Sequence, residues 1–181
     1  MKKVFSFLGE TLKIVLAALI IVIPIRYFIF QPFFVKGQSM EPNFETGDYL
    51  IIDEISYRFR EPQRGEVVVF KYPQNPSQRY IKRIIGLPGE TVDIADGKLT
   101  VYKDGVALEL DEAGYLTPEE LAGMPGKTHI VLDEDEYFVM GDNRPVSYDS
   151  RRWGPLPKEN IIGRVLVRAW PFAVFAETSD K

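Results

Sequence analysis

Apolar residues follow two different patterns along the chain. Residues 12–30 are apolar except for Lys13 and Arg26, a pattern that predicts one long helix. Beyond residue 31 the apolar residues occur in short runs, many of which alternate with polar ones. Such runs, when turn residues separate them, are typical of β-strands. The pattern therefore predicts a helix followed by a body made mostly of strands.

Eight runs in this body are rich in β-branched and aromatic residues, as strands are. They are residues 49–53, 66–70, 79–85, 91–94, 99–102, 130–132, 137–140 and 162–170. Asp96-Gly97 and Asp104-Gly105 are turn signals that predict tight hairpins, and Leu87-Pro88-Gly89 is another break. Because hairpins join antiparallel neighbours, we expect a mostly antiparallel β body.

A short helix is predicted at residues 117–121. Thr117 can cap it, Pro118 suits its first turn, and Glu120 completes a capping box. The helix lies in an acidic stretch, residues 104–128, which we interpret as a peripheral insertion rather than as core.

The long apolar segment has the length of a membrane span. As a helix its 19 residues extend about 28 Å, close to the thickness of the hydrocarbon core of a bilayer. A cleavable secretory signal is the alternative, but no small-x-small cleavage pattern follows the apolar residues. We therefore favour an uncleaved anchor that holds the chain in a lipid bilayer.

Positive charge before the segment predicts its orientation. Lys2, Lys3 and Lys13 lie on its N-terminal side, so a single-pass protein of the cell membrane is expected, with its N-terminus in the cytoplasm and its body outside. Arg26 is near enough to the outer end to reach the headgroups. An aromatic belt would surround it, formed by Tyr27, Phe28, Phe30, Phe33 and Phe34.

The predicted parts of the chain are a cytoplasmic end over 1–11, an anchor over 12–30, a β core over 31–103 and 129–181, and the insertion 104–128.

Charge narrows the possible partners. The net charge of −4 hides a basic end and an acidic body, because residues 1–36 hold five basic residues and one acidic residue. The body has no basic stripe with interleaved aromatics, so nucleic acid is a poor candidate partner. The lack of cysteine excludes disulfides and metal–thiolate sites, and we expect no metal and no cofactor.

A candidate nucleophile follows the apolar segment closely. Ser39 stands nine residues after it, so even an extended linker keeps Ser39 within about 30 Å of the membrane. Without cysteine, thiol chemistry is impossible, and a Ser-His-Asp triad would have to use His129, the one histidine. A serine served by a lysine is the simpler hypothesis. An enzyme placed there would act on membrane-tethered substrates.

Lys82 is the candidate base. A lysine can act as a base only when its amine is largely neutral, which requires burial or nearby positive charge. Lys82 has apolar neighbours in its predicted strand, and Arg83 follows it. A lone lysine in a strand is more often exposed, and periodicity alone does not separate Lys82 from Lys71 or Lys36. Ser39 likewise has a plain interpretation as a turn residue.

Residues 141–154 form a dense polar segment directly after a predicted strand. A solvated loop is the plain interpretation. Ser147 or Ser150 can instead hydrogen-bond a buried amine and orient it. Four charged side chains can form a network: Asp142, Arg144, Asp149 and Arg151.

These segments, in this order, resemble bacterial type I signal peptidase, the leader peptidase that trims secreted proteins as they leave the membrane. The matching motifs are Arg26-Tyr27-Phe28-Ile29-Phe30-Gln31-Pro32-Phe33, Ser39-Met40-Glu41-Pro42, Gly47-Asp48-Tyr49-Leu50, Arg64-Gly65-Glu66-Val67-Val68-Val69-Phe70, Tyr80-Ile81-Lys82-Arg83-Ile84-Ile85-Gly86-Leu87-Pro88-Gly89-Glu90, Gly141-Asp142-Asn143-Arg144 and Ser147-x-Asp149-Ser150-Arg151. Together they are highly specific, and they cover most of the chain except residues 104–128.

The resemblance implies an antiparallel sheet or barrel-like catalytic domain with Ser39 as nucleophile and Lys82 as general base, which decides against Lys71. It implies that Ser147 holds the Lys82 amine. A supporting salt-bridge shell would consist of Arg83, Asp142, Asp149 and Arg151. The oxyanion hole of the family uses the backbone N–H of the nucleophile and, in some members, a hydroxyl two residues earlier, where this chain has Gly37.

The resemblance also implies the substrate, which is the signal peptide of a secretory preprotein with small residues one and three positions before the cut. We expect it to lie as an extended strand against residues 31–36 and 79–84. The candidates for its pocket walls are Val35, Met40, Tyr80 and Ile81.

Two other functions compete with this interpretation. A cytosolic self-cleaving repressor protease shares the Ser-Lys pair, but the predicted anchor and the acidic body argue against it. A membrane-anchored protein that only binds leader peptides needs no nucleophile, and the presence of both Ser39 and Lys82 argues against it.

Overall fold

A computed structural model of the chain describes residues 7, 9–20, 30–108, 110–118 and 127–174. Residues 9–20 are helical. Within these described ranges, no helix is both long and apolar enough to cross a membrane. The predicted anchor includes residues 21–29, which lie outside the described residues, so the anchor stays a prediction.

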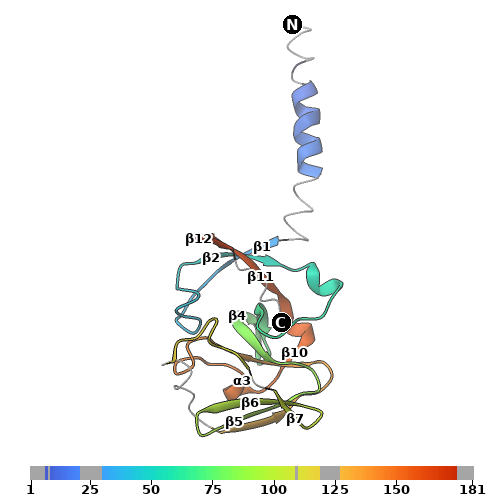
Figure 1. The fold of residues 1–181 in the computed structure, drawn as a ribbon. Helices are drawn as coiled ribbons and strands as arrows, with labels where there is room; N and C mark the ends of the chain where they lie inside the picture. The colour runs from blue at the N-terminus through green and yellow to red at the C-terminus, as the bar shows by residue number, and fades with distance from the viewer. Residues whose placement is uncertain (1–6, 8, 21–29, 109, 119–126, 175–181) are drawn as a thin grey trace.

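Two antiparallel sheets form the body (Figure 1). The larger sheet has eight strands in the order β1-β2-β11-β3-β4-β9-β10, with β12 beside β11, and the smaller sheet has the order β7-β6-β5-β8. The bounds are β1 Phe30–Phe34, β2 Tyr49–Asp53, β3 Val67–Tyr72, β4 Asn75–Gly86, β5 Thr91–Ala95, β6 Lys98–Lys103, β7 Val106–Leu108, β8 Thr128–Val131, β9 Glu136–Met140, β10 Leu156–Pro157, β11 Ile161–Trp170 and β12 Phe172–Val174. Three short helical turns complete the described elements: η1 Ser56–Arg58, α3 Ser150–Trp153 and η2 Lys158–Asn160.

This architecture confirms the predicted antiparallel β class, but the barrel-like description is wrong. A barrel closes only when its first and last strands pair. Among the described strands, β1 pairs with β2 and the two-residue β10 pairs with β9, and no ladder joins β1 to β10. Both sheets are therefore open.

All eight predicted strands are present, with ends that differ by a few residues. The largest difference is in β4, which begins at Asn75, four residues before the predicted start. The hairpin predicted at Asp96-Gly97 joins β5 to β6, and both turn residues have the positive φ that a type I′ turn requires. The predicted helix at 117–121 lies mostly outside the described residues.

The two halves of β4 differ in burial, and this difference positions the site. Its first five residues are exposed, and its last six are buried between β3 and β9. One hydrophobic cluster includes Ile81 from the buried half of β4, and it consists of Val35, Met40, Phe44, Leu50, Ile52, Val67, Val69, Ile81 and Val165. In the view of Figure 1 the smaller sheet lies at the other end of the body from β1 and β2.

Candidate active site

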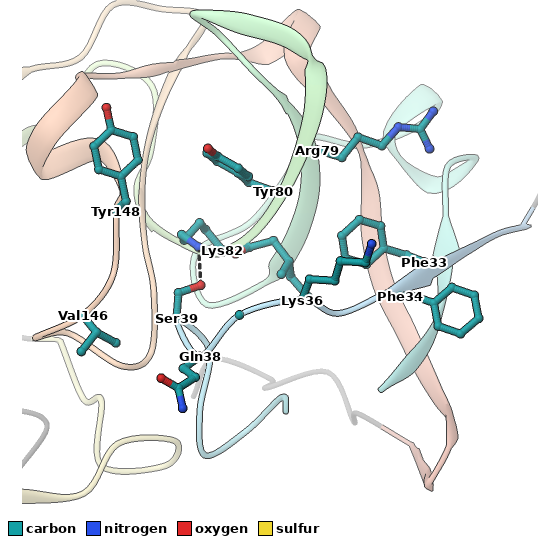
Figure 2. A pocket seen from close by; sticks show the side chains of 12 residues that line it. Phe33, Phe34, Lys36, Gln38, Ser39, Arg79, Tyr80, Lys82, Val146 and Tyr148 are labelled. Carbon is teal, nitrogen blue, oxygen red and sulfur yellow. Dashed lines mark hydrogen bonds between the residues drawn. The ribbon is translucent and has the colours of Figure 1, made fainter. Parts of the chain in front are cut away.

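Ser39 and Lys82 are in direct contact, although 43 positions separate them in the sequence. Lys82 Nζ donates a hydrogen bond to Ser39 Oγ at 2.6 Å and a second one to the backbone oxygen of Ile81 at 2.9 Å (Figure 2). Ser39 is half-buried, whereas Lys82 is only 4% exposed. A hydroxyl and a desolvated amine at this distance can exchange a proton.

Burial separates Lys82 from the other lysines that the sequence left as alternatives. Lys82 lies in the buried half of β4, opposite Val68 of β3. Lys71 and Lys36 are both exposed. The geometry therefore agrees with Lys82 as the lysine that serves Ser39.

Burial is also the main reason why the pKa of Lys82 falls to about 8 from its usual 10.5. Asp149 and Asp142 oppose this change in the pKa, and the positive charge of Arg151 supports it. The sequence interpretation assigned that positive charge to Arg83, but Arg83 is paired with Asp142 instead. Near pH 8 about half of the Lys82 amines are neutral and able to accept a proton.

A tight turn presents Ser39. The backbone N–H of Phe44 donates to the oxygen of Met40 at 2.9 Å, and the side chains of both residues are buried in the core, which anchors the turn. The N–H of Asn143 donates to the backbone oxygen of Ser39 at 3.1 Å. Among the described residues, no group accepts a hydrogen bond from the N–H of Ser39.

Gly141 allows the chain to pass close to this turn. A Cβ at Gly141 would overlap the backbone oxygen of Ser39 and the side chain of Ser147, so only glycine fits. Ser147 is 5% exposed, and its side chain and the backbone oxygen of Ser39 both lie against Gly141. However, its hydroxyl has no hydrogen-bond partner in the described part of the chain, so the expected contact with the Lys82 amine is not formed.

The four residues expected in the supporting shell form two buried ion pairs. Arg83 binds Asp142 through Nε at 2.8 Å and through Nη2 at 2.6 Å. Arg151 binds Asp149 in the same two-point manner, with both distances at 2.8 Å. Both carboxylates are fully buried, and breaking a buried ion pair by removing one partner is strongly destabilising, so each arginine is needed where it lies.

A groove of about 490 Å³ opens beside Ser39. Figure 2 shows Ser39 and Lys82 between Phe33 and Phe34 on one side and Val146 and Tyr148 on the other. Its full lining is Phe33, Phe34, Lys36, Gly37, Gln38, Ser39, Arg79, Tyr80, Ile81, Lys82, Val146 and Tyr148.

Two of the four predicted pocket walls, Tyr80 and Ile81, line this groove. The other two, Val35 and Met40, do not line it and are buried in the hydrophobic cluster that contains Ile81, at 2% and 1% exposure. Sequence reasoning missed Val146 and Tyr148. Their signal was apolar surface in a loop dense in charged and hydroxyl side chains, and the structure leaves them 59% and 47% exposed.

Comparisons with known proteins agree on one family. The family model described as signal peptidase, peptidase S26, matches residues 8–170. A probable signal peptidase I-2 from Synechocystis is 42% identical over 91% of this chain and 72% of its own length. A signal peptidase I from Leptolyngbya laminosa is 40% identical over 93% and 83%. Signal peptidase I V from Bacillus subtilis is 37% identical over 90% and 96%.

An antiparallel β body with a groove and a serine hydroxyl beside a desolvated amine is the arrangement of a serine-class hydrolase. The family model and the named relatives make the assignment specific. The chain belongs to the signal peptidase family, peptidase S26, and is a signal peptidase I hydrolase.

Proposed function

We propose that this chain is a membrane-anchored serine endopeptidase that removes signal peptides from exported preproteins, with Ser39 as nucleophile and Lys82 as general base. The observation that carries the proposal is the 2.6 Å contact between Lys82 Nζ and Ser39 Oγ at the groove. The pKa of Lys82, about 8, supplies the neutral amine that the chemistry needs.

The proposed reaction has two halves. The neutral Lys82 amine accepts the proton of Ser39 Oγ as the oxygen attacks the scissile carbonyl, and the ammonium then donates this proton to the leaving amine of the mature protein. An ester of Ser39 with the signal peptide remains. Lys82 next deprotonates a water molecule, which attacks the ester carbonyl, and the returned proton restores the Ser39 hydroxyl. The unpaired N–H of Ser39 can stabilise the oxyanion in both halves.

Free strand edges support the expected mode of substrate binding. β9 pairs with β4 only from Arg83 onward, and β1 pairs only with β2, within the described residues. The backbone of residues 79–82 therefore has one unpaired edge, to which an extended peptide can add. Arg79 Nη1 donates to Gln31 Oε1 at 3.3 Å, so the two strands flank a common space.

Tyr80 and Ile81 are the proposed walls of the pocket for the residue before the cut. Ile81 is 5% exposed and packs on the core, so it cannot easily move away. A shallow apolar pocket with such a wall admits alanine and excludes larger residues by steric clash.

We further propose that residues 12–30 anchor the enzyme, with the N-terminus in the cytoplasm and the body outside. The apolar run and the lysines before it support this proposal. Resistance of the full chain to extraction from membranes at alkaline pH tests the anchor.

The enzymatic proposal is tested with the detergent-solubilised full chain and a secretory preprotein. Wild-type protein is expected to release a mature protein whose new N-terminus follows a small residue, as N-terminal sequencing would report. Ser39→Ala is the control. Cleavage by Ser39→Ala, or cleavage at scattered positions, would contradict the proposal.

A further inference from the structure

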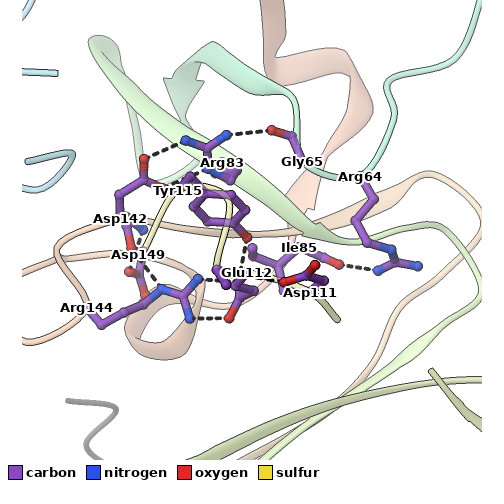
Figure 3. A network of polar contacts seen from close by, with 12 residues as sticks. Arg64, Gly65, Arg83, Ile85, Asp111, Glu112, Tyr115, Asp142, Arg144 and Asp149 are labelled. Carbon is purple, nitrogen blue, oxygen red and sulfur yellow. Dashed lines mark hydrogen bonds and ion pairs between the residues drawn. The ribbon is translucent and has the colours of Figure 1, made fainter. Parts of the chain in front are cut away.

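The acidic stretch 104–128 contributes a segment that reaches the site. Residues 111–116 lie beside the supporting shell, and two of them, Glu112 and Leu116, are each only 5% exposed. Figure 3 shows Tyr115 below Arg83, with its hydroxyl toward Glu112, and Glu112 facing Arg144.

Glu112 holds the loop that contains Asp142. It forms a two-point ion pair with Arg144, in which one of the two contacts measures 3.0 Å. Arg144 is 1% exposed, and its Nε also donates to the backbone oxygen of Gly141 at 3.2 Å. Because both charges are removed from water, each depends on the other, and the pair fixes the segment against this loop.

Tyr115 covers the other ion pair of the loop. The guanidinium carbon of Arg83 lies 3.9 Å from the centre of the Tyr115 ring, a cation–π contact, while Arg83 binds Asp142. The Tyr115 hydroxyl donates to Glu112 at 2.6 Å. Burial and the Glu112 charge raise the pKa of Tyr115 well above its usual value, so the hydroxyl remains a donor.

Asn43 joins the same segment to the turn of the nucleophile. Its amide nitrogen donates to the backbone oxygen of Tyr115 at 2.8 Å and to Asp142 Oδ2 at 2.9 Å. Asn43 follows Ser39 by four residues in the same turn. The segment therefore contacts both stretches that the site must keep aligned, the Ser39 turn and the loop after β9.

We propose that residues 111–116 position the active site, with Glu112 and Tyr115 holding the Arg83–Asp142 pair and the Ser39 turn at a fixed separation. This role rests on the proposed function of Ser39 and Lys82. Tyr115 and Glu112 do not touch the reacting atoms, so they act through Asn43, Arg83 and Arg144. Since reacting groups tolerate displacements of only about 1 Å, the expected defect is in kcat rather than in substrate binding.

Three variants of the full chain test the role with the preprotein assay. Tyr115→Leu removes the ring from Arg83, and we expect kcat to fall at least about 10-fold with KM changed less than about 2-fold. Tyr115→Phe keeps the ring and is expected to retain kcat within about 3-fold. Asn43→Ala, which leaves the core and the ring in place, is expected to lower kcat in the same way as Tyr115→Leu.

Ile94→Ala is the matched control, because it removes buried apolar atoms from the smaller sheet and lowers stability without touching these contacts. All variants are assayed at a temperature at which circular dichroism shows them folded.

The proposal is overturned if folded Tyr115→Leu keeps the wild-type kcat. It is also overturned if Ile94→Ala loses as much kcat as Tyr115→Leu at a similar loss of Tm. If Tyr115→Leu does not fold, wild-type kcat in Asn43→Ala overturns it. Failure of the proposed function would look different, because wild-type protein itself would then not cleave the preprotein.

Discussion

Lys82 is an ionisable side chain that the fold removes almost completely from water. Its charged form is disfavoured, which lowers its pKa at a cost in stability, as the proposed role of general base requires. The sequence could suggest this lysine but could not show its burial, because Lys71 also lies in a strand with apolar neighbours. The resemblance to a known family favoured Lys82 over Lys71, and the burial of Lys82 agrees with that choice.

The pH dependence of activity follows from the same residue. With a Lys82 pKa of about 8, kcat/KM for preprotein cleavage is expected to rise roughly tenfold per pH unit up to pH 8 and then level off. Initial rates between pH 5 and pH 10 measure this acid limb. A rate that stays constant down to pH 5, while the protein remains folded, would contradict a lysine base.

Stability is expected to change in the opposite sense to activity in Lys82→Met. The folded pKa of Lys82, about 8, lies below its ordinary value of 10.5, so the lysine costs stability below pH 10.5, with the full cost reached below pH 8. At pH 7 the variant should gain up to about 3 kcal/mol in free energy of unfolding, and the gain should shrink by more than half at pH 9.5. Urea unfolding at pH 7 and at pH 9.5 measures this gain in free energy of unfolding. An equal gain at the two pH values would show that the charge of Lys82 is not the cause of the gain.

Hydrophobic alternation predicted most strands of the molecule, because their cross-strand neighbours share one buried face. It missed β7, β10, β12 and α3, which have two to four residues and are too short to show a period. It also missed β1, because its phenylalanines were interpreted as a membrane belt; Phe33 instead packs on the core. Val35 and Met40 were expected in the groove, but local pattern does not tell which side of a turn faces solvent.

The position of β4 beside the groove leads to a prediction of specificity. When the residue before the cut is varied among Ala, Gly, Leu and Phe in one preprotein, the small residues should be cleaved and Phe should not, because Ile81 is the proposed wall of the pocket. Ile81→Ala should restore cleavage after Phe. Equal rates after Ala and Phe in the wild-type enzyme would disprove this account of the wall.

Long-range pairs were the least predictable part of the molecule. Arg83 and Asp142 are 59 positions apart, and Arg144 and Glu112 are 32 apart, so no periodicity connects them. The first pair was expected only from the family resemblance. The second was not expected, since the stretch that contains Glu112 is acidic and looked peripheral, and only the folded chain brings it to Arg144.

The whole molecule combines a predicted anchor with a groove that contains Ser39 and Lys82. We propose that these two residues form one catalytic unit. The most direct test compares preprotein cleavage by Ser39→Ala, Lys82→Met and Lys71→Met, each shown to be folded by circular dichroism. The first two are expected to lose at least about 10³-fold in rate, because a nucleophile and its base fail together, whereas Lys71→Met should stay within about 3-fold of wild type. Loss of activity in Lys71→Met with retained activity in Lys82→Met would contradict the assignment.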